Sequence, residues 1–419
     1  MNRRVMYGFK EFTNFEDAIK KFRERVNLCD DVERVETKNS LGRILANEIR
    51  SPLDLPPFDR SVVDGYAVRS IDVSGASPSN PITLKIVGKV FADTEYNLSL
   101  GKDESVEIFT GGRIPSGADC VLMAEDCRRD GNELIVFKQC FSMQNISRRG
   151  EDFMAGETVL NAGTVIKPFH LGALISLGIR EIDVLRRARI SVISTGNEIH
   201  DIDDGSHGTI DATRPMIISS IRDMGLDPVD MGTVPDDEEL IIKKLEEALA
   251  SSDMVVITGG TSIGEHDLVP DAVNHVAKPG IIVHGISMRP ARTTGFAFHG
   301  NKPILMISGF PVAAYISSNI FLREFFEKFY GTKLDPPPTI RGRLTMRWPN
   351  QAGIRSFVRV IVRRVGNEYT VEPLRLTGSG ILSTLTRANG LLVIDEKSEG
   401  YDEGDYVDVI ITQPVEVIK

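Results

Sequence analysis

Apolar runs of strand length alternate with amphipathic runs of helix length between residues 189 and 331, and glycines follow several of the apolar runs. This pattern predicts buried strands at 189–195, 254–258 and 303–308 and helices at 215–224, 236–251 and 311–330. Strands that alternate with helices form a doubly wound parallel sheet, which binds ligands at the carboxyl ends of its strands. We therefore expect an α/β domain over residues 188–331, with a ligand site at its glycine turns.

The rest of the chain needs further domains, because 419 residues exceed what one hydrophobic core supports. Residues 51–149 contain short β-rich runs broken by Gly, Pro, Asn and Asp, which predicts a small β domain. A stiff Asp-Pro-Pro-Pro linker at 335–338 precedes further alternating strands without clear helices. Residues 332–419 are therefore expected to form a small β barrel or sandwich.

Composition and charge exclude some classes of function. The 59 acidic residues outnumber the 49 basic ones, and the formal net charge of -10 argues against a nucleic-acid scaffold, which needs a basic face. The four cysteines form no CxxC pair and lie near no histidine at zinc-finger spacing, so we expect buried free thiols. The start of the chain has no apolar signal core and no run of 18 apolar residues occurs, which predicts a cytoplasmic protein without a membrane span.

The segment 56–67 places two carboxylates and a serine between a Pro-Pro pair and a glycine. The prolines fix φ and exclude a helix, so this segment should be a rigid loop that directs Asp59, Ser61 and Asp64. Short turns rich in Asp and Ser also use these side chains only to satisfy their own backbone. The residues alone leave a polar site and a structural turn equally open.

Glycines and hydroxyl side chains stand together at two strand ends, residues 194–198 (Ser-Thr-Gly-Asn-Glu) and 257–262 (Ile-Thr-Gly-Gly-Thr-Ser). Glycine lets backbone N–H groups approach an anion closely, and hydroxyls add donors, so both turns suit a phosphate or an oxyanion. Neither is a Walker A or GxGxxG motif, and such strand ends are also ordinary turns. Glu198 and Asp267 follow these ends and could share a divalent cation that prefers oxygen ligands.

The segment 56–67 resembles the PxFDxSxxDGYA signature of the molybdopterin molybdenumtransferases, the MoeA family, to which the C-terminal domain of gephyrin belongs. Further segments resemble motifs of this family in the same order, so that the resemblance covers nearly all of the chain: 110–119, 148–152, 194–198 and 258–264. The resemblance implies a MoaB/Mog-like α/β domain and a discontinuous linker domain at 1–50 and 150–187, into which the β domain is inserted. The helices predicted at 13–26 and 169–177 would belong to that discontinuous domain, although the residues alone also allow separate domains.

The resemblance also implies which residues act. The family's catalytic residues correspond to Asp59, Thr110, Asp152, Glu198, Asp236 and Asp267. Its ligand-binding residues correspond to Ser61, Asp64, Thr195, Gly196, Gly259, Gly260, Ser262, Arg289, Arg292, Pro311, Arg359 and Ser379. Glu198, Asp236 and Asp267 would hold Mg²⁺, although Asp236 also stands three residues before Glu239 and fits a capping box. Because these residues come from separate domains, the resemblance implies a site shared across a homodimer.

Three segments depart from the family pattern. The usual Lys-Pro-Gly-Lys-Pro becomes Arg-Pro-Ala-Arg-Thr at 289–293, which keeps the positive charge but replaces a glycine by Ala291. The usual Gly-Leu-Pro-Gly-Asn-Pro becomes Gly-Phe-Pro-Val-Ala-Ala at 309–314, and a side-chain amide is lost. The usual Asp-(Ser/Thr)-Asn becomes Asp-Ala-Thr at 211–213. These departures leave the fold prediction intact and predict altered ligand binding.

If the chain acts as its relatives do, it inserts molybdate into adenylylated molybdopterin and releases AMP. Tungstate is an equal candidate, since both are tetrahedral oxyanions of the same charge, and a partner protein that adenylylates molybdopterin would supply the substrate. The alternative is a diverged paralogue that binds a pterin or nucleotide, or scaffolds partner proteins, without inserting metal. The three departures favour this alternative, whereas the retained Asp59, Glu198 and Asp267 favour the enzyme.

Overall fold

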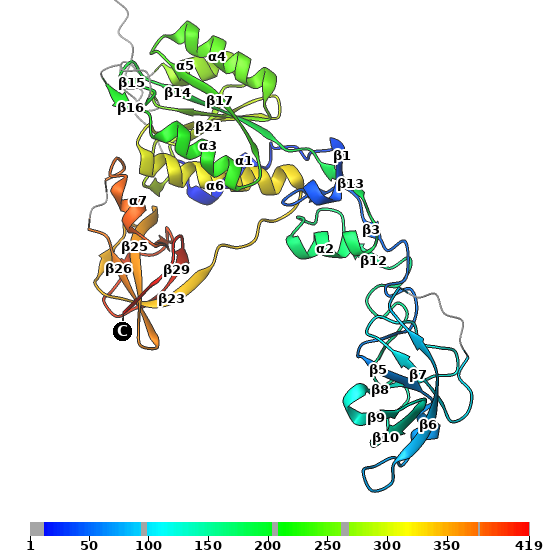
Figure 1. Ribbon diagram of the computed structural model, residues 1–419. Coiled ribbons are helices and arrows are strands. Elements are labelled where there is room, and N and C mark those ends of the chain that lie inside the picture. Colours follow the sequence, from blue (N-terminus) through cyan, green and yellow to red (C-terminus); the bar gives the residue numbers. More distant parts are fainter. Residues whose placement is uncertain (1–11, 94–98, 203–207, 261–267, 376–377, 419) are drawn as a thin grey trace, which may run out of the picture. The chain divides into compact units, whose positions relative to one another are not determined.

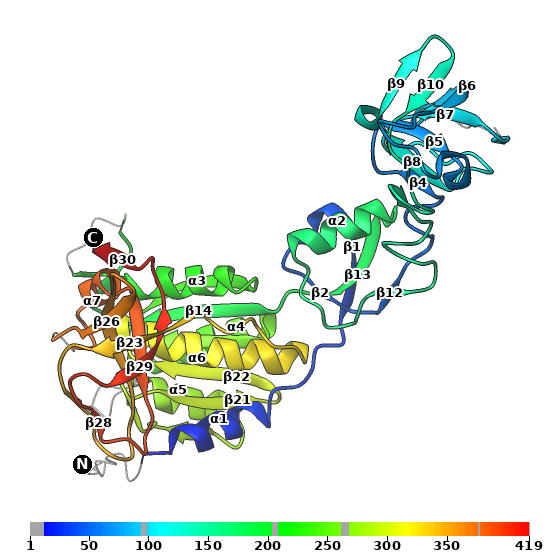
Figure 2. The same cartoon turned by 90° about the horizontal axis from the view of Figure 1, so that it is seen from below.

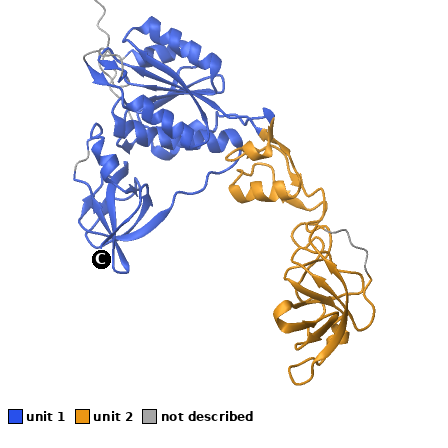
Figure 3. Cartoon of the chain, in the orientation of Figure 1, with its two compact units in different colours: residues 1–33, 185–419 blue, residues 34–184 orange. Residues whose placement is uncertain are grey.

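The computed structural model describes residues 12–93, 99–202, 208–260, 268–375 and 378–418. The chain divides into two compact units, which are described separately below (Figure 3). Unit 1 comprises residues 1–33 and 185–419, and unit 2 comprises residues 34–184. None of the described helices combines the length and the apolar character that a membrane crossing requires.

The centre of unit 1 is a six-stranded sheet with the order β17-β14-β18-β22-β21-β19. Its strands are β14 (Arg189–Thr195), β17 (Asp227–Val234), β18 (Met254–Thr258), β19 (Ile281–His284), β21 (Gly295–His299) and β22 (Lys302–Ile307). The first four strands of the order are parallel, which confirms the α/β class. The last two pairings, β22 with β21 and β21 with β19, are antiparallel, because a tight hairpin rather than a helix joins β21 to β22. The expectation of a wholly parallel sheet is therefore wrong at this edge.

Helices cover both faces of this sheet (Figures 1 and 2). One face carries α4 (Glu238–Ser251) and α5 (Val269–Val276), whose apolar side chains form a buried cluster with those of β14, β18 and β22. The other face carries α3 (Thr213–Asp223) and α6 (Pro311–Tyr330). Strands β14 and β18 and helix α6 begin and end at the predicted residues, and α6 stops at Gly331, which has a left-handed conformation.

Helix α1 (Phe15–Arg23) packs against α6 in unit 1. Its N-cap Asn14 accepts a hydrogen bond of 2.9 Å from the backbone N–H of Glu16. Phe22, in the last turn of the helix, is buried and contacts the rings of Phe296, Phe298 and Phe321. These aromatic contacts join the helix to the α/β sheet. The four-domain division of the chain, which groups this helix with residues 150–187, stays a prediction.

The C-terminal part of unit 1 is a closed five-stranded barrel. Its strands pair in the order β25-β26-β23-β29-β27 and back to β25, where β23 is Thr339–Leu344, β25 Arg355–Val365, β26 Glu368–Pro373, β27 Gly390–Ile394 and β29 Tyr406–Ile411. The barrel prediction is therefore confirmed, although a short helix α7 (Ser383–Arg387) was missed. Strand β20 (Met288–Arg289) pairs with β25 and so joins the α/β domain to the barrel. Short strands β24 (Trp348–Pro349), β28 (Gly400–Tyr401) and β30 (Glu416–Ile418) complete this part.

Unit 2 contains a six-stranded sheet with the order β8-β5-β7-β6-β10-β9. Its strands are β5 (Gly65–Val68), β6 (Ile82–Val90), β7 (Glu104–Ile108), β8 (Cys120–Met123), β9 (Cys127–Asp130) and β10 (Glu133–Val136). The predicted β segment at 51–149 contains all of them. A smaller part of the unit combines β1 (Val32–Glu36), β2 (Ile44–Leu45), β3 (Ile49–Arg50), β12 (Thr158–Leu160), β13 (Glu181–Leu185) and helix α2 (Pro168–Ser176).

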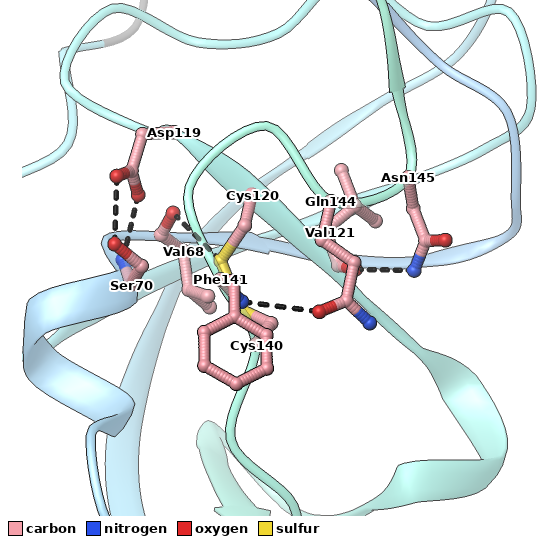
Figure 4. The surroundings of a disulfide bond; sticks show 9 residues. All are labelled: Val68, Ser70, Asp119, Cys120, Val121, Cys140, Phe141, Gln144 and Asn145. Atoms are coloured by element: carbon pink, nitrogen blue, oxygen red, sulfur yellow. Dashed lines mark hydrogen bonds between the residues drawn. A yellow bond between two sulfur atoms is a disulfide. The ribbon is translucent and has the colours of Figure 1, made fainter.

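Cys120 and Cys140 form a disulfide in unit 2, with their Cα atoms 6.4 Å apart (Figure 4). The prediction of free thiols is therefore wrong for this pair, whereas Cys29 and Cys127 are free. Cys120 lies in β8 and Cys140 in the loop after β10, and both belong to one buried cluster. Tertiary packing rather than a sequence motif brings them together. Burial raises the pKa of the Cys127 thiol to about 12.

Candidate active site

A cavity of about 1200 Å³ opens in unit 1 at the carboxyl ends of β14, β18 and β22. Its wall continues through residues 288–293, which include β20, and through residues 378–380 of the C-terminal part. Predicted site residues that line it are Thr195, Gly196, Glu198, Asp236, Gly259, Gly260, Arg289, Arg292, Pro311 and Ser379. The cavity lies at the strand ends where a parallel α/β sheet binds its ligands.

Asp236 is positioned by the turn that follows β14. Its carboxylate accepts a hydrogen bond of 3.1 Å from the backbone N–H of Asn197, and its own N–H donates one of 3.1 Å to the side chain of Asn197. The neighbouring Asp237, not Asp236, caps α4 by accepting a hydrogen bond of 3.0 Å from the N–H of Leu240. The capping-box interpretation of Asp236 is therefore wrong, and Asp236 lines the same cavity as Glu198.

Asp211 is a cavity residue that the sequence reasoning did not assign to the site. It is buried, and its carboxylate accepts hydrogen bonds of 2.6 Å from the Ser194 hydroxyl and 3.1 Å from the Arg214 guanidinium. Arg214 is itself buried and also pairs with Asp201 and Asp230. Asp211 also accepts hydrogen bonds of 3.1 and 3.0 Å from the backbone N–H groups of Thr213 and Arg214, so it fixes the start of α3 at the wall of the cavity.

Gly259 lines the cavity, and the packing of the neighbouring strand also requires a glycine at this position. Gly259 has a φ of +88°, and a Cβ atom there would lie 2.4 Å from the carbonyl oxygen of Thr195. The hydroxyl of Thr195 donates a hydrogen bond of 3.1 Å to the carbonyl oxygen of Thr258. The close approach of β14 and β18 therefore requires a glycine here, whatever the ligand. Both the ordinary-turn interpretation and a ligand role remain consistent with this geometry.

The basic side of the cavity is formed by arginines. Arg289 and Arg292 are exposed side chains of its wall. Arg359 is not among the residues that line the cavity, but it lies close enough to Arg289 for the two charges to repel each other. It is only 5% exposed, and within the described part of the chain its Nη2 atom has no hydrogen-bond partner. Burial, and then repulsion from Arg289, lowers the pKa of the Arg359 guanidinium. A buried cation beside a second cation is costly, and a bound anion would offset that cost.

Two of the three departures from the family pattern are connected directly. The hydroxyl of Thr213 donates a hydrogen bond of 2.9 Å to the carbonyl oxygen of Gly309, so the start of α3 is tied to the turn that precedes α6. In the third departure, Ala291 has a φ of +79°, a left-handed conformation that favours glycine. Residue 291 thus has the left-handed conformation that glycine adopts readily, although it is an alanine.

The predicted site residues of unit 2 form a group of their own. The Asp64 carboxylate accepts hydrogen bonds of 2.8 Å from both the N–H and the hydroxyl of Thr110, which lower the pKa of Asp64. Asp59 accepts a hydrogen bond of 2.7 Å from the N–H of Arg149, close in sequence to the exposed Asp152. The buried Ser61 donates its hydroxyl to the carbonyl oxygen of Val63 at 2.5 Å and so serves its own turn.

The predicted metal site consists of three carboxylates, Glu198, Asp236 and Asp267. Ser262 and Asp267 lie outside the described residues, and among those described no group of three or more His, Cys, Asp or Glu side chains could hold a metal ion. Glu198 and Asp236 nevertheless line the same cavity, and their oxygen atoms suit a hard cation such as Mg²⁺. The described residues therefore fit part of the predicted metal site.

Comparison with known proteins agrees with this architecture. Three family models match in order: the MoeA N-terminal region (domain I and II) at residues 13–178, a probable molybdopterin binding domain at 191–328 and the MoeA C-terminal region (domain IV) at 341–412. A protein of Methanocaldococcus jannaschii named "Putative molybdopterin biosynthesis protein" is 35% identical over 94% of this chain and 96% of its own length. A molybdopterin molybdenumtransferase of Staphylococcus aureus is 31% identical over 90% of this chain and 91% of its own length.

A crystal structure of a molybdopterin biosynthesis moeA protein from Pyrococcus horikoshii has a TM-score of 0.83 and 29% identity, and the match covers 96% of this chain and 100% of that one. The fold and the cavity define a multidomain α/β protein with a ligand-sized cavity at the strand ends of its sheet. The chain belongs to the MoeA family of molybdopterin molybdenumtransferases, and it is an enzyme of the transferase class.

Proposed function

We propose that this enzyme inserts molybdate, or tungstate, into adenylylated molybdopterin and releases AMP. The observation that carries the proposal is that one cavity joins two carboxylates, Glu198 and Asp236, to the arginines of residues 289–292. Such a cavity can hold a phosphorylated ligand and a cation at the same time. The molybdopterin biosynthesis and molybdenumtransferase relatives support this choice of substrate.

The arginines would bind the phosphate groups. Arg289 and Arg292 line the cavity, and the guanidinium fork suits phosphate oxygens. Arg359 would contribute from behind Arg289, where its buried charge has no carboxylate in hydrogen-bond contact within the described residues. A bound phosphate would therefore relieve the repulsion between the two neighbouring guanidinium groups.

The carboxylates would act at the opposite side of the ligand. Glu198, Asp236 and Asp267 would hold Mg²⁺, which neutralises phosphoryl charge when bound. Asp236, which Asn197 holds in place, would orient the water that attacks the phosphoanhydride. The P–O–P bond breaks: the water oxygen bonds to the phosphorus that it attacks, the bridging oxygen leaves with the other phosphate, and the two water protons are divided between AMP and the pterin phosphate. The two dithiolene sulfurs then replace one oxide ligand of molybdate, which leaves with the thiol protons as water.

We also propose that the enzyme is a homodimer whose partner completes the site. Asp59, Thr110 and Asp152 of unit 2 would contribute the oxyanion end, with Asp64 holding Thr110 in place. Helix α2 supports self-association, because it contains no charged residue and exposes Phe169 and Ile175 to 68% and 57%. The double variant Phe169→Asp and Ile175→Asp should shift light scattering from dimer to monomer, whereas Phe141→Asp, an exposed site elsewhere in unit 2, should not.

The compartment and the supply of substrate belong to the same proposal. We propose a cytoplasmic enzyme that receives its substrate from a partner protein able to adenylylate molybdopterin. The Cys120–Cys140 disulfide is unusual for that compartment in mesophiles, although intracellular proteins of hyperthermophiles carry such bonds.

The second candidate is a paralogue that binds a pterin or a nucleotide without inserting metal. The observation that favours it is the start of α6, where Val312, Ala313 and Ala314 are buried and provide no side-chain amide to the cavity. Calorimetric titration with molybdopterin, its adenylylated form and AMP, with and without Mg²⁺ and molybdate, separates the two. Tight binding of the adenylylated form together with molybdate-dependent AMP release supports the enzyme. Binding without release supports the paralogue, and the absence of any binding overturns both.

A further inference from the structure

Phe310 is an apolar side chain left open to the cavity. It is the N-cap of α6 in the short turn that follows β22, and its N–H donates a hydrogen bond of 3.2 Å to the Ser308 hydroxyl. The residue is 60% exposed and lines the cavity, whereas the other phenylalanines of α6 are buried. A large ring that contributes little to the core is therefore presented to whatever occupies the cavity.

The surroundings of the ring keep it uncovered. Gly380 lies beside it, and a Cβ atom at that position would be 3.1 Å from the ring atom Cδ1 and 3.5 Å from Cε1. The carbonyl oxygen of Ser379 accepts a hydrogen bond of 3.0 Å from the N–H of Val312, which fixes this segment against the start of α6. Glycine at 380 thus allows the C-terminal segment to pass the ring without a side chain that would cover it.

The same cavity holds the groups that bind anions. Arg289 and Arg292 line it together with Phe310. A ligand that satisfies both features has a phosphate group and a flat apolar face, which describes a phosphorylated pterin or a nucleotide. Aromatic side chains stack on such rings in offset geometry, with little demand for a particular pattern of hydrogen bonds.

We propose that Phe310 is the platform on which a planar nitrogen heterocycle, the pterin or the adenine of the ligand, stacks in this cavity. The proposal rests on the proposed function and names the residue that determines ring recognition in it. Leucine, the residue usual in the family at this position, has no π face. Stacking on Phe310 would offset the amide that the family carries in this turn and this chain lacks.

Titrations of AMP, ribose 5-phosphate and pterin-6-carboxylate test this proposal with the full chain and its Phe310→Ala, Phe310→Leu and Phe310→Tyr variants. Phe310→Ala should weaken the ligand whose ring stacks by about tenfold or more and leave ribose 5-phosphate, which has no ring system, unchanged. Phe310→Leu should lose most of the same affinity and Phe310→Tyr should retain it. The ligand that responds, AMP or the pterin, identifies the ring.

Several results would overturn the proposal. If AMP or the pterin binds the natural chain and Phe310→Ala leaves that affinity unchanged, Phe310 is not a platform, although the proposed function survives. If Phe310→Leu binds as well as the natural chain, the contact is apolar without stacking. If neither ring ligand binds the natural chain, the proposal and the proposed function fail together. Unchanged melting temperatures confirm that the variants fold, as expected for an exposed residue.

Discussion

The hydroxyl of Thr213 donates a hydrogen bond of 2.9 Å to the carbonyl oxygen of Gly309, and this contact joins two segments that both differ from the family pattern. The first residue starts α3, and the second lies in the turn before α6. A family asparagine at position 213 and a family Gly-Asn-Pro after residue 311 would build this corner of the cavity differently. In this chain the hydroxyl of Thr213 therefore links the start of α3 to the turn before α6.

Thr213→Val should lower the free energy of unfolding by about 1 kcal/mol, because it keeps the shape of the side chain and leaves the Gly309 carbonyl oxygen without this donor. Denaturant titration measures the change. Thr213→Ser is the matched control, since it retains the hydroxyl. Equal stability of the valine variant and the natural chain would show that the contact contributes nothing.

Ala291→Gly should raise the free energy of unfolding by about 0.5–1 kcal/mol. The alanine has a φ of +79°, and the relief of that conformation outweighs the greater freedom of glycine in the unfolded chain. Ala291→Val, with a β-branched side chain at the same φ, should be destabilising. A glycine variant less stable than the natural chain would mean that position 291 carries no backbone strain.

Gly259→Ala should be destabilising by about 2 kcal/mol or more, because its Cβ atom would lie 2.4 Å from the carbonyl oxygen of Thr195. Gly353→Ala is the control that measures the cost of the left-handed backbone conformation without this clash. Gly353 has a similar φ of +82° but no atom within 4 Å of the added Cβ, so its variant should lose only about 1 kcal/mol. Similar losses in both variants would show that β14 and β18 tolerate a side chain between them.

The Cys120–Cys140 disulfide should leave two titratable thiols, Cys29 and Cys127, in the unfolded, unreduced chain. A thiol assay in denaturant counts them. Reduction should lower the stability of unit 2 by about 3 kcal/mol, because a bond across a loop of this length restricts the unfolded state. Cys127→Ala is the control that leaves the disulfide intact, and a count of four thiols would refute the pairing.

The elements with strong local patterns could be predicted from the sequence, whereas contacts between distant segments could not. The runs of β14 and β18 and the helix α6 carry their own boundaries, since a glycine ends each of them. The antiparallel edge of the sheet and the disulfide depend on which segments meet in three dimensions. Neither the antiparallel edge nor the disulfide can be recognised from the spacing of residues in the sequence.

Some residues of the candidate site could likewise be predicted from the sequence, whereas others depend on tertiary structure. Turn residues such as Gly196 and Gly259 could be predicted because they directly follow buried strands, whereas Arg359 could be found only through the family resemblance. Asp211 and Phe310 were named within departing segments, but nothing in the sequence shows that one is buried under Arg214 and the other is exposed to the cavity. Burial of a single side chain is a tertiary property.

Release of AMP from adenylylated molybdopterin is the measurement that tests the proposed function most directly. With the full chain, Mg²⁺ and molybdate, the account predicts AMP release that depends on molybdate and falls by about 10²-fold or more in Asp236→Asn. Asp237→Asn is the matched control, because this adjacent carboxylate caps α4 and asparagine caps equally well. AMP release that needs no molybdate, or that is equal in the Asp236→Asn and Asp237→Asn variants, would contradict the account.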